Sequence, residues 1–155
     1  MARVLVTVSR GWNDRPGMHG VLAAVWTLLP GAILVSGANP DGDAMAEGVW
    51  EGLGGWVERH RADWGAPCQE KCKPGHRVRR RDGSTFCPAA GMYRNHRMAR
   101  LGALLCLGFI GPCVKRGCAR PRPHSSHGAT DCADYAEHEC GILTRRYPPA
   151  PIPVA

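Results

Sequence analysis

The sequence predicts an α/β protein with a Rossmann-like parallel sheet of about five strands and helices on both faces. Short aliphatic runs alternate with segments whose apolar residues recur every three or four positions. The 20 glycines and 13 prolines supply the turns that separate these segments. The 155 residues suit one domain, and a hydrophobic content of 44% is enough to bury a core.

Five aliphatic runs are the predicted strands, and the spacing of apolar residues between them predicts the helices. The strands are expected at residues 3–8, 32–36, 56–60, 103–110 and 142–147. The helices are expected at residues 16–29, 43–54, 92–102 and 129–140. The first run is nearly continuous in aliphatic residues, which is typical of a parallel strand covered on both faces. The third run is the weakest, so we expect it at an edge of the sheet.

Two irregular segments interrupt the alternation. Residues 64–91 and 111–127 are rich in Cys, Pro and Gly, and we interpret them as insertions in a single domain of residues 1–147. Residues 148–155 form a proline-rich tail that is expected to be extended or disordered.

Residues 20–40 carry no charged side chain and would be the candidate for a membrane span. Pro30 and Gly31 lie in the middle of this stretch, where proline breaks a spanning helix and the pair favours a turn. The apolar run at the start is too short for a signal peptide. We therefore expect a cytoplasmic protein with no membrane contact.

In a reducing compartment, clustered cysteines are more often metal ligands or free thiols than disulfides.

The net charge of +7 favours anionic partners such as nucleotides, nucleic acid or phosphate groups. Six cations gather in a basic loop at residues 71–81: Lys71, Lys73, Arg77, Arg79, Arg80 and Arg81. This loop has two interpretations, a nucleic-acid-binding surface or a cationic lid over an anionic ligand. A homo-oligomer is also compatible with the sequence.

Three loops of small residues follow predicted strands and lead into helices. Right-handed crossovers place all such loops at the carboxyl edge of a parallel sheet, where ligands bind. The free amide groups at the start of each helix attract anions. The loops therefore predict a site for a nucleotide-like small molecule, although ordinary Gly and Ser turns are the alternative. The expected ligand residues are Ser9, Arg10, Gly37, Ala38, Gly42, Asp43, Gly128 and Ala129.

Five short segments occur in an order that is typical of a known family. They read VLVTVSRGW at residues 4–12, SGANPDGDA at 36–44, HRADW at 60–64, GMYRNHRM at 91–98, and LGF at 107–109 followed later by GA at 128–129. These segments resemble the YspA-related branch of the SLOG superfamily, which also contains the Lonely Guy phosphoribohydrolases. The resemblance implies a Rossmannoid fold that binds nucleotides or nucleotide-derived ligands. It adds Arg94, which would hold a phosphate, and Asn95, which would contact a base or ribose.

The resemblance leaves the question of catalysis open. The Lonely Guy enzymes carry PGGxGTxxE, whose glutamate serves cleavage of the N-glycosidic bond. Aligned on Gly128, this chain has Cys132 at the glutamate position, and serines replace the paired glycines. A thiol does not readily stabilise an oxocarbenium-like centre. Because Asp131 and Asp134 are offset along the helix, we expect a sensor or binder with little hydrolase activity.

Each insertion contains four Cys and His residues. The first set is Cys68, Cys72, His76 and Cys87, and the second is Cys113, Cys118, His124 and His127. Structural zinc takes four such ligands, and metal ligation would supply the folding energy that these apolar-poor loops lack. We expect structural zinc in at least one set, with free thiols or a disulfide as alternatives.

One histidine of the second set and the three cysteines outside both sets need further comment. His127 lies beside Gly128, so it could serve either the metal or the ligand site. Cys106, Cys132 and Cys140 fall on a predicted strand and helix, and we interpret them as small buried apolar residues.

Overall fold

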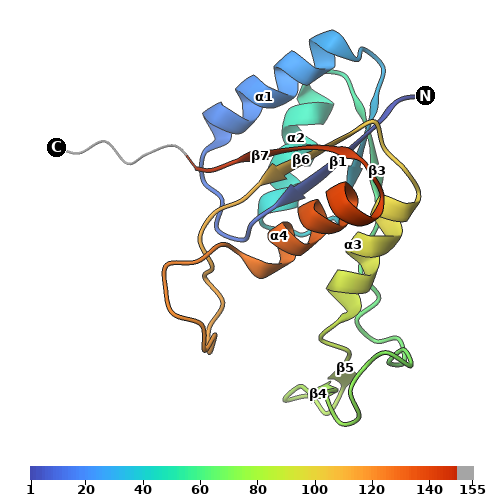
Figure 1. The fold of residues 1–155 in the computed structure, drawn as a ribbon, viewed down its shortest axis with the longest axis vertical. Helices are drawn as coiled ribbons and strands as arrows, with labels where there is room; N and C mark the ends of the chain where they lie inside the picture. Colours follow the sequence, from blue (N-terminus) through green and yellow to red (C-terminus); the bar gives the residue numbers. More distant parts are fainter. Residues whose placement is uncertain (150–155) are drawn as a thin grey trace, which may run out of the picture.

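The computed structural model describes residues 1–149 (Figure 1). Its main sheet has five strands in the order β3-β2-β1-β6-β7, and all neighbouring strands are parallel. The strands are β1 (Arg3–Val8), β2 (Ile33–Ser36), β3 (Trp56–Arg59), β6 (Leu105–Phe109) and β7 (Leu143–Tyr147). The predicted Rossmann-like sheet is therefore confirmed, and β3 lies at an edge as expected.

Helices cover both faces of this sheet. One face packs against α1 (Arg15–Leu28) and α2 (Gly42–Gly52), and the other against α3 (Ala90–Arg100) and α4 (His127–Asp134). The chain continues from α4 into a π-helix, η1 (Tyr135–Glu139), where a single α-helix was expected over residues 129–140. Both α3 and α4 begin two residues earlier than the apolar spacing predicts.

The continuous aliphatic character of β1 follows from burial on both faces. Val4 and Val6 pack in the core cluster that contains residues of α1 and α2, whereas Leu5 packs with Met98 of α3 and Cys132 of α4. The three β1 side chains are fully buried. Each such side chain contributes about 1.5–3 kcal/mol to folding.

The order of the strands switches at β1. From β1 the chain moves to β2 and β3 on one side, then crosses to β6 and β7 on the other. The loops after β1 and β6 therefore separate at the carboxyl edge of the sheet, which is where open α/β sheets form their crevices.

The two insertions leave the sheet at this edge. Residues 60–89 extend as an arm whose far end carries a short antiparallel hairpin of β4 (Val78–Arg79) and β5 (Thr85–Phe86) (Figure 1). The sequence did not predict this hairpin. The second insertion is the loop that joins β6 to α4. Of the predicted tail, residues 150–155 lie outside the described residues.

No helix among residues 1–149 combines the length and the apolar character needed to cross a membrane.

Candidate functional site

A cleft of about 1150 Å³ lies at the carboxyl edge of the sheet. Its walls come from the end of β1, the loop before α2, the start of α3, the second insertion and α4. Six predicted ligand residues line this cleft: Arg10, Asp43, Arg94, Asn95, Gly128 and Ala129. The structure thus brings together residues from four separate parts of the sequence.

The other four predicted ligand residues support the cleft from behind its lining. Ser9 is buried, and its Oγ accepts a hydrogen bond of 2.8 Å from the Gly111 backbone nitrogen, which ties the loop after β1 to the loop after β6. A Cβ at Gly42 would lie 2.7 Å from the Ser9 carbonyl oxygen, so only glycine allows α2 to start so close to β1. Ala38 has a φ of 55°, which lets the loop turn sharply after Gly37.

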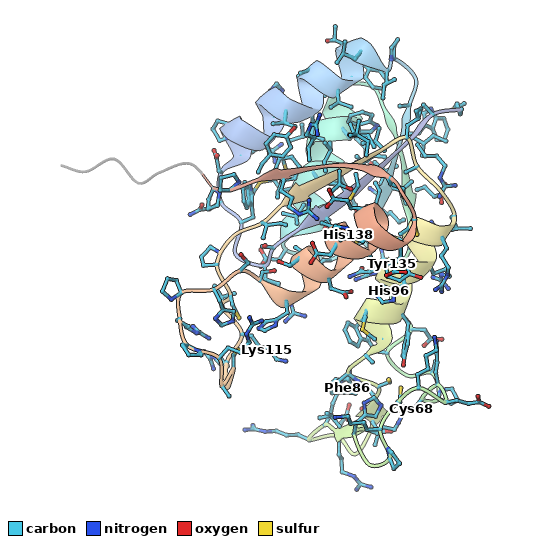
Figure 2. The ribbon with its side chains drawn as sticks, viewed as in Figure 1. Cys68, Phe86, His96, Lys115, Tyr135 and His138 are labelled. Carbon is cyan, nitrogen blue, oxygen red and sulfur yellow. The ribbon has the colours of Figure 1, made fainter. Side chains whose placement is uncertain are left out.

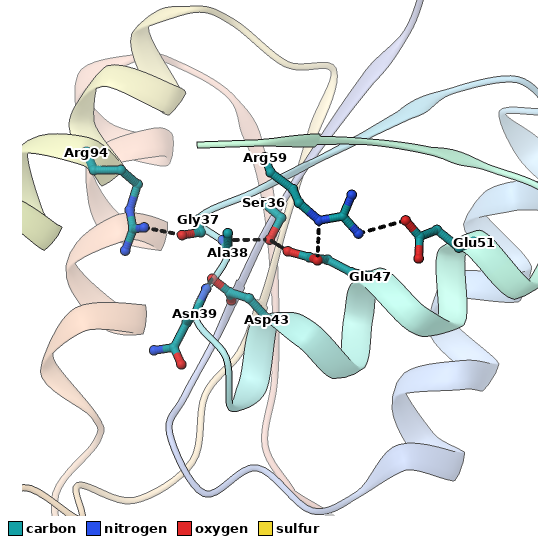
Figure 3. Close-up of polar contacts among 9 residues, drawn as sticks. All are labelled: Ser36, Gly37, Ala38, Asn39, Asp43, Glu47, Glu51, Arg59 and Arg94. Carbon is teal, nitrogen blue, oxygen red and sulfur yellow. Dashed lines mark hydrogen bonds and ion pairs between the residues drawn. The ribbon is translucent and has the colours of Figure 1, made fainter. Parts of the chain in front are cut away.

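A polar network fixes the loop between β2 and α2 (Figure 3). The Ser36 hydroxyl donates to Glu47 Oε1 at 2.6 Å and accepts from the Ala38 backbone nitrogen at 3.0 Å. Arg59 on β3 donates from Nε to Glu47 Oε2 at 2.6 Å. Because these contacts join β2, α2 and β3, the loop is held in one position at the edge of the cleft.

Arg94 reaches from α3 across this loop (Figure 3). Its Nη1 donates to the carbonyl oxygen of Gly37 and to that of His60, and its Nε donates to Asn95 Oδ1 at 2.8 Å. A Cβ at Gly37 would lie 2.7 Å from Arg94 Cζ, so glycine is what allows this approach. Burial lowers the pKa of Arg94, and the nearby Asp43 opposes that shift. The result is an oriented guanidinium in the cleft wall.

Asp43 lies in the first turn of α2 and is only 6% exposed. Burial raises its pKa to about 6, although the Asn39 backbone nitrogen, 3.2 Å from Oδ2, and the Arg94 charge favour the ionised form. A carboxyl group with this pKa can hold or release a proton near neutral pH. Proximity to the helix dipole alone would lower the pKa, so burial dominates here.

Asn95 joins the two helices that flank the cleft. Its Oδ1 accepts from Arg94, and its Nδ2 donates to the Gly128 carbonyl oxygen at 3.4 Å. The side chain is 8% exposed. Its amide therefore positions Arg94 and the start of α4, and the contact to a base or ribose stays a prediction.

The cleft carries more cations than the sequence analysis assigned to it. Besides Arg10 and Arg94, the second insertion contributes Lys115, Arg116 and Arg120 to its lining. These three residues lie close to Cys113 and Cys118 of the second set. Their clustering within residues 115–120 is the sequence feature that could have predicted a cationic wall of the cleft. The hydroxyl of Thr130, another lining residue, is buried without a hydrogen-bond partner among the described residues.

Cys132, which aligns with the catalytic glutamate of the Lonely Guy enzymes, does not face the cleft. Cys132 is fully buried, and burial raises the pKa of its thiol. It shares the sheet-facing stripe of α4 with Ala129 and Ala133, so the opposite face points outward. Asp131 and Asp134 lie on that face and line the cleft. The expectation that their offset removes them from the site is therefore wrong.

Both of these carboxylates already have partners. Asp131 Oδ2 lies 3.0 Å from His96 Nε2, and the His96 ring stacks on Tyr135 with centroids 3.8 Å apart. Asp134 forms an ion pair of 2.8 Å with Arg146. His96 could not be singled out from the sequence, because its partner lies 35 residues further along the chain.

The first Cys/His set comes together in the arm. The ligand atoms of Cys68, Cys72, His76 and Cys87 all lie within 4.8 Å of one another. His76 Nε2 is 3.0 Å from Cys68 Sγ and 3.5 Å from Cys87 Sγ, and the sulfur atoms of Cys72 and Cys87 are 3.8 Å apart. The Tyr93 hydroxyl of α3 lies 3.3 Å from Cys72 Sγ. This group could hold a metal ion.

The second set comes together between the loop and α4. It comprises Cys113, Cys118, His124 and His127, again within 4.8 Å. The Nε2 atoms of His124 and His127 are 3.2 Å apart, and each lies within 3.5 Å of Cys118 Sγ. His124 Nδ1 contacts the Pro121 carbonyl oxygen at 2.9 Å, which leaves Nε2 available to a metal. His127 thus points its Nε2 into this group, which could also hold a metal ion.

All eight cysteines of the chain are free thiols, so the disulfide alternative finds no support. Cys106 and Cys132 are buried, as predicted. Cys140 is only partly buried, because it lies at the end of η1 rather than inside a helix.

The basic loop does not cover the cleft. None of residues 71–81 lines it, and Figure 2 shows Cys68 and Phe86 at the far end of the arm, which carries these residues away from the sheet. Arg77 is used within the arm, where it donates to Thr85 and to the carbonyl oxygen of Ala66. Arg80 stacks over Phe86 at 4.5 Å. The interpretation of this loop as a lid is therefore wrong.

The fold and these groups define a class: an α/β protein with a five-stranded parallel sheet that carries two Cys/His groups able to hold metal ions. No family model matches the chain. No solved structure matches it. Among curated proteins, it is 34% identical over 115 residues to the Gene 61 protein of Mycobacterium phage D29, which covers 70% of this chain and 77% of the relative. The chain belongs to the family of that phage protein.

Proposed function

We propose that the protein binds a phosphate-bearing nucleotide or nucleotide derivative in the cleft, and that structural zinc holds its two insertions. The observation that carries this proposal is the placement of Arg94. Two backbone carbonyl groups orient its guanidinium in the cleft wall, at the edge where the strand order switches. Because these groups and Asn95 engage Nη1 and Nε, Nη2 is the nitrogen that is placed to donate charge-assisted hydrogen bonds to phosphate oxygens.

Further features of the cleft fit an anion. The first turn of α4 lines it, and the N-cap residue Ser126 makes no side-chain cap to the helix. The backbone amides of that turn favour a negatively charged ligand group. The hydroxyl of Thr130, which lacks a partner among the described residues, could donate to the same group.

Apolar side chains line another part of the cleft. Trp64, Met92 and Val114 contribute to its walls, and Trp64 is braced edge-on by Phe86 with centroids 6.1 Å apart. These side chains offer a surface that a base or ribose could cover. The resemblance of five sequence segments to the YspA-related SLOG branch supports the same ligand class.

Calorimetric titration with a panel of nucleotides tests the proposal. Arg94→Ala should weaken binding by about 1.5–3 kcal/mol, because it removes a charge-assisted contact. Arg100→Ala is the matched control, since Arg100 lies on the same helix but outside the cleft lining. Failure of every nucleotide to bind the wild-type protein would refute nucleotide binding.

Five of the six contact distances within the Cys/His sets support zinc, and only the 3.0 Å between Cys68 Sγ and His76 Nε2 is shorter than a zinc-bound pair would have. Tetrahedral bonds of about 2.3 Å to sulfur and about 2.05 Å to nitrogen place two sulfurs about 3.8 Å apart, sulfur and nitrogen about 3.5 Å, and two nitrogens about 3.3 Å. Cys72 and Cys87 lie 3.8 Å apart, and Cys118 lies 3.5 and 3.4 Å from His124 and His127. Zinc is the usual occupant of tetrahedral sites built from Cys and His.

Metal analysis of protein purified without added metal tests this assignment. We expect two zinc ions per chain, one for each set. Less than about a tenth of that amount, with a stability that a chelator does not change, would refute it. The cytoplasmic location that favours free thiols stays a prediction.

A second candidate function rests on the hairpin of the arm. Arg79, Arg80 and Arg81 are exposed there, away from the cleft, and the first Cys/His set lies at their base. A basic surface on a metal-stabilised arm suits nucleic acid. Replacement of all three arginines by alanine should make the affinity for a labelled duplex less dependent on salt. The slope of log affinity against log salt concentration should fall by the amount that corresponds to the loss of about three phosphate contacts. Equal slopes for this variant and the wild type would refute this candidate.

A further inference from the structure

We propose that the second insertion is a metal-dependent clamp, which makes the cleft select ligands with two or more phosphates over a monophosphate. This inference rests on the nucleotide binding proposed above and names the substrate class of that site. It concerns the loop between β6 and α4, its three cations and the Cys/His set at its base.

The cations of the cleft come from two separate places. Arg94 projects from α3, whereas Lys115, Arg116 and Arg120 belong to the second insertion. Figure 2 shows Lys115 on the side of the loop that faces the arm and α3. A single phosphate bound at Arg94 therefore leaves a second cationic group with no ligand charge beside it.

The acidic side chains of the cleft do not neutralise the loop cations. Asp134 is paired with Arg146, Asp131 lies 3.0 Å from His96, and no ion pair within residues 1–149 joins either of them to Lys115, Arg116 or Arg120. Asp43 is buried with a raised pKa, next to Arg94. The three loop cations therefore keep a net positive charge, which would attract the additional phosphates of a ligand.

The loop has little other than the Cys/His set to hold its cations in place. Its base is pinned by backbone hydrogen bonds, from Cys113 to His124 at 2.7 Å and from Ser126 to Gly111 at 3.0 Å. Between these points, apart from the contacts of Cys118 and His124 with His127 in the Cys/His set, the hydrogen bonds found within residues 1–149 stay inside the loop, such as that from Arg122 to the Lys115 carbonyl oxygen. Val114 is 54% exposed and gives little apolar anchorage.

A metal ion would supply the missing tether. Cys118 lies in the segment that carries the three cations, and His127 is the first residue of α4, which lines the cleft. One ion bound by both residues would connect that segment to the helix. Because the ion and the phosphates would order the same loop, each should strengthen the binding of the other.

Titration calorimetry with AMP, ADP and ATP tests the clamp, using zinc-loaded protein without magnesium. We expect ADP and ATP to bind at least about tenfold more tightly than AMP, since each additional phosphate meets loop cations. The triple variant Lys115→Ala, Arg116→Ala, Arg120→Ala should lose this preference but keep its affinity for AMP. A matched control removes three exposed cations outside the cleft lining: Arg15, Arg61 and Arg145.

The outcomes separate the two proposals. If AMP, ADP and ATP bind the wild type with similar affinities, the clamp is refuted and nucleotide binding stands. If none of them nor any other nucleotide binds, both proposals fail. If the control variant loses the preference as fully as the loop variant, the effect is one of net charge and the clamp is refuted.

The role of the metal is tested by two further measurements. Cys118→Ser should abolish the preference for ADP, whereas Cys140→Ser, which changes a cysteine outside both Cys/His sets, should keep it. If Cys118→Ser does not fold, the rate of zinc release to a chelator from wild-type protein is decisive. ADP should slow the release of one of the two ions by at least about threefold, and AMP should not. Release that is indifferent to ADP would overturn the coupling.

Discussion

Asp43 combines deep burial with a carboxyl group, and its replacement by asparagine should stabilise the protein at neutral pH. Burial raises its pKa from 3.8 to about 6, so the folded state binds this proton more tightly than the unfolded chain does. A shift of this size corresponds to about 3 kcal/mol of destabilisation once the group is ionised in both states. Asparagine can still accept from the Asn39 nitrogen, but its amide group needs a partner of its own, so we expect a net gain of about 2 kcal/mol.

The pH dependence follows from the same shift. Below about pH 4 the carboxyl is protonated in both states and contributes no penalty. Between pH 4 and 6 the unfolded chain releases the proton first, so the contribution of Asp43 to stability falls as the pH rises. Above pH 6 the full penalty is present. Asp43→Asn should therefore be slightly less stable than the wild type at pH 4, by up to about 1 kcal/mol for its unpartnered amide, and more stable at pH 7.5.

Urea denaturation of both proteins at pH 4, 5, 6 and 7.5 measures this difference. Metal affinity also changes with pH, but it changes equally in both proteins and cancels in the comparison. Asp63→Asn is a suitable control because that side chain is exposed, and it should change the free energy of unfolding by less than about 0.5 kcal/mol. Equal stability of Asp43→Asn and the wild type at pH 7.5 would show that burial of the Asp43 carboxylate does not destabilise the fold.

Three other predictions concern packing, turnover and metal. Gly42→Ala should destabilise the protein by about 1–3 kcal/mol in urea denaturation, because its Cβ would meet Val8 and the Ser9 carbonyl. Gly48→Ala, with no atom within 4 Å of its Cβ, should instead be neutral or stabilising. Incubation with AMP and N6-substituted AMP should release little free base on chromatography; release that survives Cys132→Ser but is lost in Asp131→Asn would show an enzyme. Chelator treatment should lower the Tm and increase proteolysis within residues 60–89, and an unchanged digestion pattern would contradict a structural metal.

The sheet was predictable from sequence because its strands are buried on both faces. Runs such as that of β1 are short and nearly continuous in aliphatic residues, which favours a parallel strand covered on both faces. The two Cys/His sets were predictable for a related reason, since ligand chemistry restricts the residue types and each set is local in sequence.

The details of the cleft were harder to predict because they depend on which face of a helix is buried. The burial of Cys132 and the offset of Asp131 and Asp134 from it were predicted, but not that the face with the two aspartates lines the cleft. The stripe of small residues on α4 shows which face of the helix packs on the sheet, but only when the position of the sheet is known. The position of the basic loop relative to the cleft could not be predicted either, because it depends on the path that the arm takes away from the sheet.

Native mass spectrometry of the intact protein, incubated with a nucleotide panel, measures whether one chain binds zinc and a nucleotide together. We expect a main species of one chain, two zinc ions and one nucleotide, with the nucleotide largely lost in Arg94→Ala and the zinc retained. A chain that carries neither zinc nor nucleotide would refute both the structural metal and the ligand proposed for the cleft.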